Sequence, residues 1–294
     1  MRLGIDLGGT KIEIVALDPA GELLVRRRVP TPTHDYEAIV AAIASLVRDV
    51  ESELGQVGSV GIGTPGAISP ATGLMKNANT VVLNGRPLGR DLGEALGREI
   101  RLANDADCFA LSEATDGAAA GADTVFGVIL GTGTGGGIVV GGRLLCGPNA
   151  IAGEWGHNPL PWPRDDERPG PACYCGKHGC IETFLSGPGL RRDHGGDVDG
   201  RELVRLAEAG DARAEATLVR YEDRLARALA TIVNVLDPAC IVLGGGVSNI
   251  DRVYASVPLR MGEYVFSDRV DTRLVRARHG DSSGVRGAAW LWSG

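Results

Sequence analysis

The sequence predicts an α/β protein built from two similar halves. Residues 3–17 read as a short apolar strand, a Gly-rich turn and a second strand, and residues 124–140 repeat that arrangement. Self-similarity of this kind indicates a duplicated structural unit. In the first half, two apolar segments end in polar residues, one at Thr64 and the other at Asn104. Open α/β sheets place their ligands at strand ends of this type.

The regular elements can be assigned in chain order. Residues 2–28 alternate apolar runs with turns, which predicts an antiparallel meander of three strands. Apolar side chains recur at helical spacing over residues 36–54 and 214–236, so we expect two amphipathic helices there. A further helix is expected to begin near Asn104, and a last short helix is expected to be capped by Ser282 and Ser283. Further strands are expected at residues 59–63, 100–103, 138–140 and 241–243.

We expect these halves to face each other across a cleft as two domains, in the duplicated actin-like (ribonuclease H-like) architecture. The predicted small domain spans residues 1–115, and the predicted large domain spans residues 116–282. The C-terminal helix, residues 283–294, is expected to return to the small domain. The loop at residues 158–171 and the polar segment at residues 191–200 are expected to be surface insertions.

The composition favours a soluble, cytoplasmic protein that binds small molecules. The 294 residues are 44% hydrophobic, enough for one large core or two smaller ones. No apolar run could span a bilayer, and the chain starts directly on a strand pattern, so we expect neither a membrane nor a secretory leader. The net charge of −7 argues against a nucleic-acid partner, and the one basic run, residues 26–28, is expected to decorate a solvated strand edge. Cys108, Cys146 and Cys240 are expected to be core thiols in a reducing compartment.

Two Gly-rich turns, one in each half, are predicted to bind nucleotide phosphates. Gly131-x-Gly133-x-x-Gly136 formally matches a dinucleotide fingerprint, but a strand follows it where a helix is needed, and no P-loop motif is present. Backbone N–H groups in such turns can bind phosphate oxygens, although one such turn alone is more often a tight turn and nothing else. The repetition, with a third Gly run at residues 244–246, favours a nucleotide. The residues expected to bind it are Asp6, Gly8, Gly9, Thr10, Lys11, Thr132, Gly133, Thr134, Gly135, Gly136, Gly137 and Gly245.

Two carboxylates of the first half are candidates for phosphoryl-transfer chemistry. Asp6 precedes the first turn, where it could hold Mg²⁺ against bound phosphates. Asp105 is the candidate base, because a hydroxyl that attacks a phosphoryl group loses its proton as the bond forms. Helix capping is the plainer alternative for Asn104 and Asp105, and Asp107 is expected to be the cap itself.

A cysteine cluster in the second half predicts a structural zinc site. Cys173, Cys175 and Cys180 fall within eight residues. Thiolates at this spacing, joined by one nitrogen ligand, suit tetrahedral Zn²⁺ with no position left for catalysis. Buried free thiols are the alternative. The spacing leaves open whether His157 or His178 is the fourth ligand.

Taken together, the sequence resembles the ROK family of bacterial sugar kinases and sugar-responsive repressors along essentially its whole length. The motifs that carry this resemblance are Asp6-Leu-Gly-Gly-Thr-Lys11, Gly63-Thr-Pro-Gly66, Asn104-Asp-Ala, residues 131–137, Gly153-Glu-Trp-Gly-His157, residues 173–182 and Gly244-Gly-Gly246. The resemblance implies ATP-dependent phosphorylation of the 6-hydroxyl of a hexose, with Asp105 as the base. It also selects His157 as the zinc ligand. The sugar-binding residues that it implies are Gly66, Asn79, Asn104, Asp105, Glu154, His157 and Glu182.

Within the family, residues 83–85, 154–161 and 279–290 are most similar to the fructokinase (mannofructokinase) branch, so D-fructose is the expected substrate. The N-acetylglucosamine kinase branch is similar in the same regions, and glucokinase or mannokinase activity is a further alternative. The sequence departs from the family at Asp107, where an asparagine is usual. A second carboxylate there could raise the pKa of Asp105 by like-charge repulsion.

Two alternatives come from other functional classes. A non-catalytic sugar-sensing regulator would resemble the repressor members, but these carry an added N-terminal DNA-binding segment, and only five residues precede Asp6 here. A zinc-stabilised binding protein that uses no nucleotide would show no change of melting temperature with ATP. The resemblance also suggests a homodimer.

Overall fold

The computed structural model describes residues 1–292, and these form two compact units. The first consists of Met1–Gly121, Gly137–Ala152 and the C-terminal segment from Asp281, and the second consists of Ala122–Gly136 and Gly153–Gly280. Residues 137–152, which we expected in the large domain, therefore belong to the first unit. No helix within residues 1–292 is both long and apolar enough to cross a membrane.

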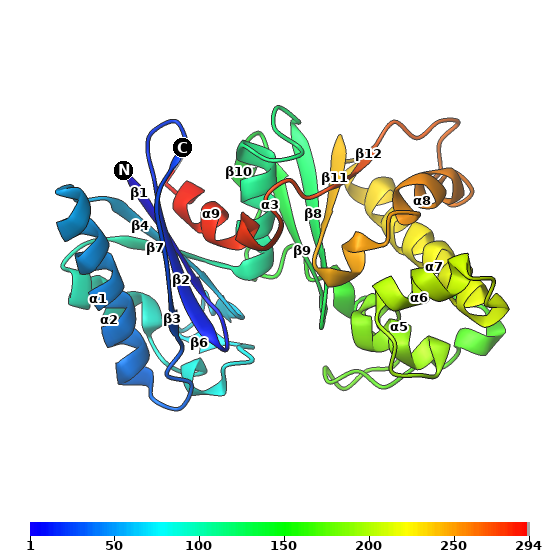
Figure 1. Ribbon diagram of the computed structural model, residues 1–294, viewed down its shortest axis with the longest axis horizontal. Coiled ribbons are helices and arrows are strands. Elements are labelled where there is room, and N and C mark those ends of the chain that lie inside the picture. The colour runs from blue at the N-terminus through cyan, green and yellow to red at the C-terminus, as the bar shows by residue number, and fades with distance from the viewer. Residues whose placement is uncertain (293–294) are drawn as a thin grey trace. The chain divides into compact units, whose positions relative to one another are not determined.

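The first unit contains a five-stranded sheet in the order β3-β2-β1-β4-β7 (Figure 1). Its strands are β1 (Arg2–Leu7), β2 (Lys11–Leu17), β3 (Leu23–Pro30), β4 (Ser59–Thr64) and β7 (Ile100–Asn104). The first three pair antiparallel, which confirms the predicted meander, whereas β4 is parallel to both β1 and β7. A separate two-stranded sheet is formed by β5 (Ala67–Ile68) and β6 (Met75–Lys76).

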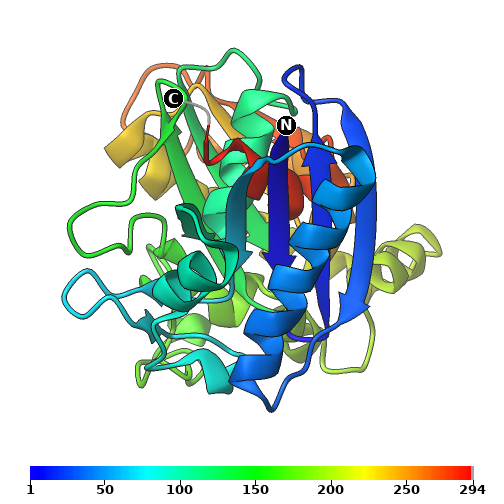
Figure 2. The ribbon, with the colours of Figure 1, turned by 90° about the vertical axis from the view of Figure 1, so that its left-hand side faces the viewer.

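Helices cover both faces of this sheet. On one face lie α1 (Tyr36–Leu54) and α2 (Leu88–Leu96), and on the other lies α9 (Ser283–Trp290), which packs on α3 (Asp105–Thr115) (Figures 1 and 2). The apolar residues of α1 that set its helical period, such as Ile39 and Ile43, are fully buried against the strands. α9 approaches so closely that a Cβ on Gly4 would lie 2.1 Å from the carbonyl oxygen of Val285.

The second sheet repeats the arrangement of the first. Its order is β10-β9-β8-β11-β12, with β8 (Thr124–Leu130), β9 (Thr134–Val140), β10 (Arg143–Leu144), β11 (Cys240–Gly244) and β12 (Arg273–Arg276). β11 is parallel to β8 and β12, just as β4 is parallel to β1 and β7. The helices of the second unit are α4 (Ile181–Leu185), α5 (Gly187–His194), α6 (Gly200–Glu208), α7 (Ala212–Leu236) and α8 (Val253–Met261). The short 3₁₀ helices are Val81–Leu83, Trp155–His157, Asp165–Glu167, Gly246–Asn249 and Gly280–Ser282.

Residues 135–137 lie in strand β9, not in the Gly-rich turn that the sequence predicted. A Cβ on Gly136 would lie 2.9 Å from the rings of Phe126 and Trp155. A Cβ on Gly137 would lie 2.6 Å from the carbonyl oxygen of Ala106, at the start of α3. Close packing within the protein therefore requires both glycines.

The loop at residues 158–171 lies largely at the surface, as expected, but a buried ion cluster anchors its middle. Arg227 of α7 is 1% exposed and donates to both carboxylate oxygens of Glu167, at 2.8 and 2.9 Å. It also donates to the carbonyl oxygens of Pro161 and Trp162, and Arg224 donates to Glu167. We call this group of residues 161, 162, 167, 224 and 227 the Arg227 clamp. It anchors a largely exposed loop to α7.

Two smaller predictions are also wrong. Ser282 precedes α9, but its side chain makes no capping hydrogen bond, and the Ser283 hydroxyl donates to Glu113. Cys146 is exposed, whereas Cys108 and Cys240 are buried as predicted.

Candidate functional site

The first phosphate-binding candidate is the hairpin between β1 and β2. Gly8 N–H donates to the carbonyl oxygen of Lys11 and closes the turn, in which Gly9 and Thr10 are exposed. Thr31, which follows β3, fixes the hairpin from the side. Its hydroxyl donates to the Gly8 carbonyl at 2.7 Å, and its N–H donates to the Thr10 carbonyl at 3.0 Å. No pattern in the sequence indicates this role for Thr31, because the contact joins residues that lie far apart in the chain.

A cavity of about 490 Å³ lies beside this hairpin. Asn79, which we expected to bind sugar, lines the same cavity as Gly9 and Thr10. Gly66, another expected sugar residue, has φ +79°, and a Cβ there would lie 2.4 Å from the carbonyl oxygen of Lys76. Only glycine fits that backbone position.

Asp105 is the first residue of α3, and a backbone N–H group at the start of that helix fixes its carboxylate. Its Oδ1 accepts a hydrogen bond from the Ala106 N–H at 2.9 Å. The cap of the helix is Asn104, whose Oδ1 accepts from the Asp107 N–H at 2.6 Å, so our assignment of Asp107 as the cap is wrong. Burial raises the pKa of Asp105, against the opposing effect of its backbone hydrogen bonds. A carboxyl group with a raised pKa is a better proton acceptor once it is ionised.

Asp6, near the end of β1, interacts electrostatically with Asp105. Burial is the largest cause that raises its pKa to about 6, and the negative charges of Asp105 and Glu13 add to it. Lys11 and Arg28 act in the opposite direction. A carboxylate that is costly to ionise without a cation nearby is suited to a divalent metal ion or to a cationic ligand complex.

Asp6 should therefore destabilise the free protein at neutral pH. The pKa of Asp6 is higher in the folded state than the usual value of 3.8, so the protonated side chain favours folding. This contribution is complete below about pH 4 and is lost as the pH rises through about 6, where the buried carboxyl group ionises. We expect Asp6→Asn to raise the melting temperature at pH 7.5 by about 2–4 °C, corresponding to ~1 kcal/mol, while lowering turnover. Thermal unfolding without nucleotide at pH 7.5 and pH 4 tests this, and the gain should vanish at pH 4. A lower melting temperature at pH 7.5 would contradict it.

In the second unit, a candidate sugar ligand contacts the second Gly-rich turn. Glu182 Oε2 accepts a hydrogen bond from the Thr134 N–H at 2.9 Å, and a Cβ on Gly133 would lie 2.7 Å from the same oxygen. Thr132 lies in this turn, between β8 and β9. Gly245 follows β11 with φ +85°, and a Cβ there would lie 2.4 Å from the Leu130 carbonyl oxygen. The positive φ and the nearby backbone require glycine at position 245, whereas Gly133 lies against the end of the flexible Glu182 side chain.

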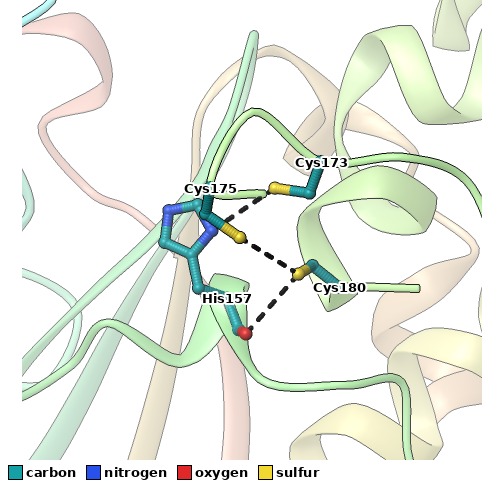
Figure 3. Close-up of side chains that lie close together, drawn as sticks. All are labelled: His157, Cys173, Cys175 and Cys180. Carbon is teal, nitrogen blue, oxygen red and sulfur yellow. Dashed lines mark hydrogen bonds between the residues drawn. The ribbon is translucent and has the colours of Figure 1, made fainter. Parts of the chain in front are cut away.

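His157 and the three clustered cysteines form a group that fits a metal ion (Figure 3). A ring nitrogen of His157 and the Sγ atoms of Cys173, Cys175 and Cys180 all lie within 4.8 Å of one another. Cys175 Sγ is 3.6 Å from Cys180 Sγ, and Cys173 Sγ is 3.6 Å from His157 Nδ1. Sulfur ligands about 2.3 Å from a tetrahedral ion lie about 3.8 Å apart, so the spacing suits such an ion. His178 is exposed and is not a member of this group.

Tyr174 supports the His157 ring and was not predicted. Its hydroxyl lies 2.9 Å from His157 Nε2, and the two rings meet edge to face, with centroids 5.1 Å apart. A histidine that binds a metal through Nδ1 keeps its proton on Nε2 and donates it to a second residue, which fixes the ring. The position of Tyr174 between two candidate ligands, Cys173 and Cys175, is the signal that could have revealed it. Glu154, another expected sugar ligand, lies three residues before His157 and is exposed.

Comparisons with known proteins agree with this arrangement. A family model described as "ROK family" matches residues 2–294. The N-acetyl-D-glucosamine kinase of Vibrio atlanticus (strain LGP32) is 40% identical over 299 residues, which cover 99% of both chains. Among solved structures, the ROK hexokinase from Thermus thermophilus is 37% identical, with a TM-score of 0.86 over 98% of this chain and 96% of that one.

A third relative is the ROK family glucokinase from Streptomyces griseus, solved in complex with glucose and AMPPNP. It is 29% identical, with a TM-score of 0.76 over 99% of this chain and 98% of that one. These structures confirm the predicted fold class, the two-domain α/β fold of actin-like sugar kinases. Because the family model spans nearly the whole sequence and relatives near 40% identity match it end to end, the chain belongs to the ROK family.

Proposed function

We propose that this protein transfers the γ-phosphoryl group of ATP to the 6-hydroxyl of N-acetyl-D-glucosamine. That it is an ATP-dependent sugar phosphotransferase follows from its membership of the family and from its kinase relatives. The finer assignment is the sugar. The observation that carries it is the 40% identity, over 99% of both chains, to an N-acetyl-D-glucosamine kinase.

The comparisons do not support the fructokinase branch that we preferred from the sequence. Relatives from several bacteria at 38–40% identity are N-acetyl-D-glucosamine kinases, which favours the alternative that the sequence had left open. The segments that suggested fructose are similar in both branches, so they could not separate the two sugars.

The residues of the first unit account for the phosphoryl transfer. The exposed hairpin at residues 8–11 offers backbone N–H groups and the Lys11 ammonium to the phosphates of ATP. Asp105 accepts the proton of the sugar hydroxyl as that oxygen bonds to phosphorus. Its contacts with the start of α3 fix the direction of its carboxylate, so that little reorganisation is needed during the reaction.

Two metal ions fit the residues described above. Asp6 would hold Mg²⁺, which neutralises charge on the transferring phosphates when bound. His157, Cys173, Cys175 and Cys180 would hold structural Zn²⁺, which leaves no open position for catalysis. Fixing this stretch orients Glu154 before it and Glu182 after it. We assign Glu154, His157 and Glu182, with Gly66, Asn79 and Asn104, to the binding of sugar.

A panel of sugars tests the assignment. ADP release would be measured with Mg-ATP and N-acetyl-D-glucosamine, glucose, mannose or fructose. We expect kcat/KM for N-acetyl-D-glucosamine to exceed that for each other sugar by about tenfold or more, because a site built to bond the acetamido group leaves polar groups unpaired with the other sugars. A higher kcat/KM for fructose would restore the first prediction, and a higher value for glucose would place the protein with the glucokinases.

A further inference from the structure

The basic run at residues 26–28 lies on β3, the edge strand of the first sheet. Its side chains lie on both faces of that sheet. Arg27 forms an ion pair with Glu53 of α1. Side chains alternate along a strand, so Arg26 and Arg28 share the other face. Both donate through Nε to the carboxylate of Glu13 in β2. The run lies on a solvated strand edge, as expected, and Arg26 and Arg28 in addition pair with Glu13.

Glu13 is a buried carboxylate, with its side chain 2% exposed. The strand register places it between Asp6 of β1 and Arg28 of β3, in one row across three strands. Burial alone would raise the pKa of Glu13, but the hydrogen bonds from Arg28 and Arg26 hold that pKa below its usual value. Both arginines form ion pairs with this carboxylate. A buried charge is tolerated only where such partners replace its lost hydration.

Lys11 is the third cation at this carboxylate. Its Nζ lies 3.6 Å from Glu13 Oε2, two residues along the same strand and hence on the same face. An unrestrained lysine ammonium samples many positions on its flexible stem. A fixed carboxylate beside it restricts where its charge lies.

The cluster presents positive charge beside the phosphate hairpin. Three cations share one buried carboxylate, and the side chains of Lys11, Arg26 and Arg28 remain 44%, 37% and 45% exposed. The exposed side of the cluster is thus cationic, although the chain as a whole carries a net charge of −7. Such a local field favours a polyanion such as a triphosphate.

We propose that Glu13, clamped by Arg26 and Arg28, is a positioning residue that holds the Lys11 ammonium in place for the triphosphate of ATP. The inference rests on the proposed function, since it deepens the role of the same hairpin. It gives the arginines of an edge strand a part in nucleotide binding, which they exert through Glu13.

The test compares matched variants on one strand. Calorimetric titration with Mg-ATP, in the absence of sugar, measures nucleotide affinity directly. We expect Glu13→Gln, which keeps the shape of the side chain but removes its charge, to weaken ATP binding by about tenfold and to raise the KM for ATP similarly, with kcat and the KM for sugar changed by less than about twofold. Arg28→Gln should weaken ATP binding by about threefold, and Arg28→Lys should restore most of that loss. Arg27→Gln is the control on the opposite face and should bind ATP like the wild type.

Wild-type ATP affinity in a folded Glu13→Gln variant would overturn the proposal. Equal loss of ATP and sugar affinity would also overturn it, because that pattern indicates a general structural defect. Should Glu13→Gln fail to fold, as judged by its melting transition, the pair Arg28→Gln and Arg27→Gln decides, and equal ATP affinity of the two overturns the proposal. The titration needs no sugar, so an error in the sugar assignment leaves the test intact, whereas a wild-type protein that binds no ATP would refute the proposed function itself.

Discussion

Replacing Asp105 with Asn should lower kcat by about 10²–10⁴-fold, the range expected when a general base is lost. The amide keeps the shape of the side chain and can still accept the Ala106 N–H hydrogen bond, so α3 should begin as before. Affinities for ATP and sugar should change little, because the lost interaction acts mainly in the transition state. Steady-state kinetics and calorimetry on the same preparation would separate the two effects. Near-normal turnover would refute the assignment of the base.

Asp107→Asn is the matched control for this variant. It also removes a carboxylate from the first turn of α3, and it restores the asparagine that is usual in the family. Burial is the main cause of the raised pKa of Asp105, so removing Asp107 should leave the acid side of the pH–rate profile in place. We expect the activity of Asp107→Asn to fall by less than about tenfold. The pH–rate profiles of the wild type and of Asp107→Asn should both decline towards acid pH, since protonation of Asp105 removes the proton acceptor.

Loss of the metal site should impair sugar binding much more than ATP binding. Cys175→Ser removes one of the four proposed ligands, and a strong chelator would remove the proposed ion. We expect either treatment to raise the KM for sugar by about tenfold or more, the range seen when the shell of a metal site is disturbed. Affinity for ATP should change by less than about twofold. The reason is that Glu154 and Glu182 flank the metal-binding stretch, whereas the hairpin at residues 8–11 belongs to the other unit.

Metal content by mass spectrometry and calorimetry with each ligand test this prediction. Cys146→Ser is the control, because it removes an exposed thiol that is not part of the cluster. It should keep one equivalent of zinc and its sugar affinity. Equal loss of both affinities in Cys175→Ser would mean that the ion supports the whole protein and not the sugar site alone.

The sequence predicted well those features that are written in short-range patterns. The helix over residues 36–54 was correct to the residue, because its apolar period is regular and both ends carry signals. Asp35 caps its start, and Gly55, in the left-handed conformation, ends it. The cysteines that the structure brings together with His157, and the hairpin between β1 and β2, were likewise visible as compact motifs.

Features that depend on distant contacts could not be predicted. Glycines at residues 135–137 looked like a phosphate-binding loop, because sequence alone does not show that Phe126 and Trp155 press against Gly136. The loop at residues 158–171 has the composition of a surface insertion, and its buried partner Arg227 lies 60 residues from Glu167. The capping of α3 was misassigned between two neighbours, since Asn104 and Asp107 are both good capping residues and only geometry separates them.

The Arg227 clamp has a consequence for how the proposed metal site would form. The ligands His157 and Cys180 are separated by 23 positions, and a flexible chain of that length would lose much conformational entropy when the ion gathers its ligands. The clamp fixes the middle of this span through contacts that involve none of the proposed ligands. Because its hydrogen bonds to Arg227 and Arg224 outweigh the effect of burial and hold the pKa of Glu167 near 2, the clamp stays charged at any pH at which the ligands can bind metal. The proposed metal site is thereby preorganised, because much of the conformational entropy of this span is lost when the protein folds.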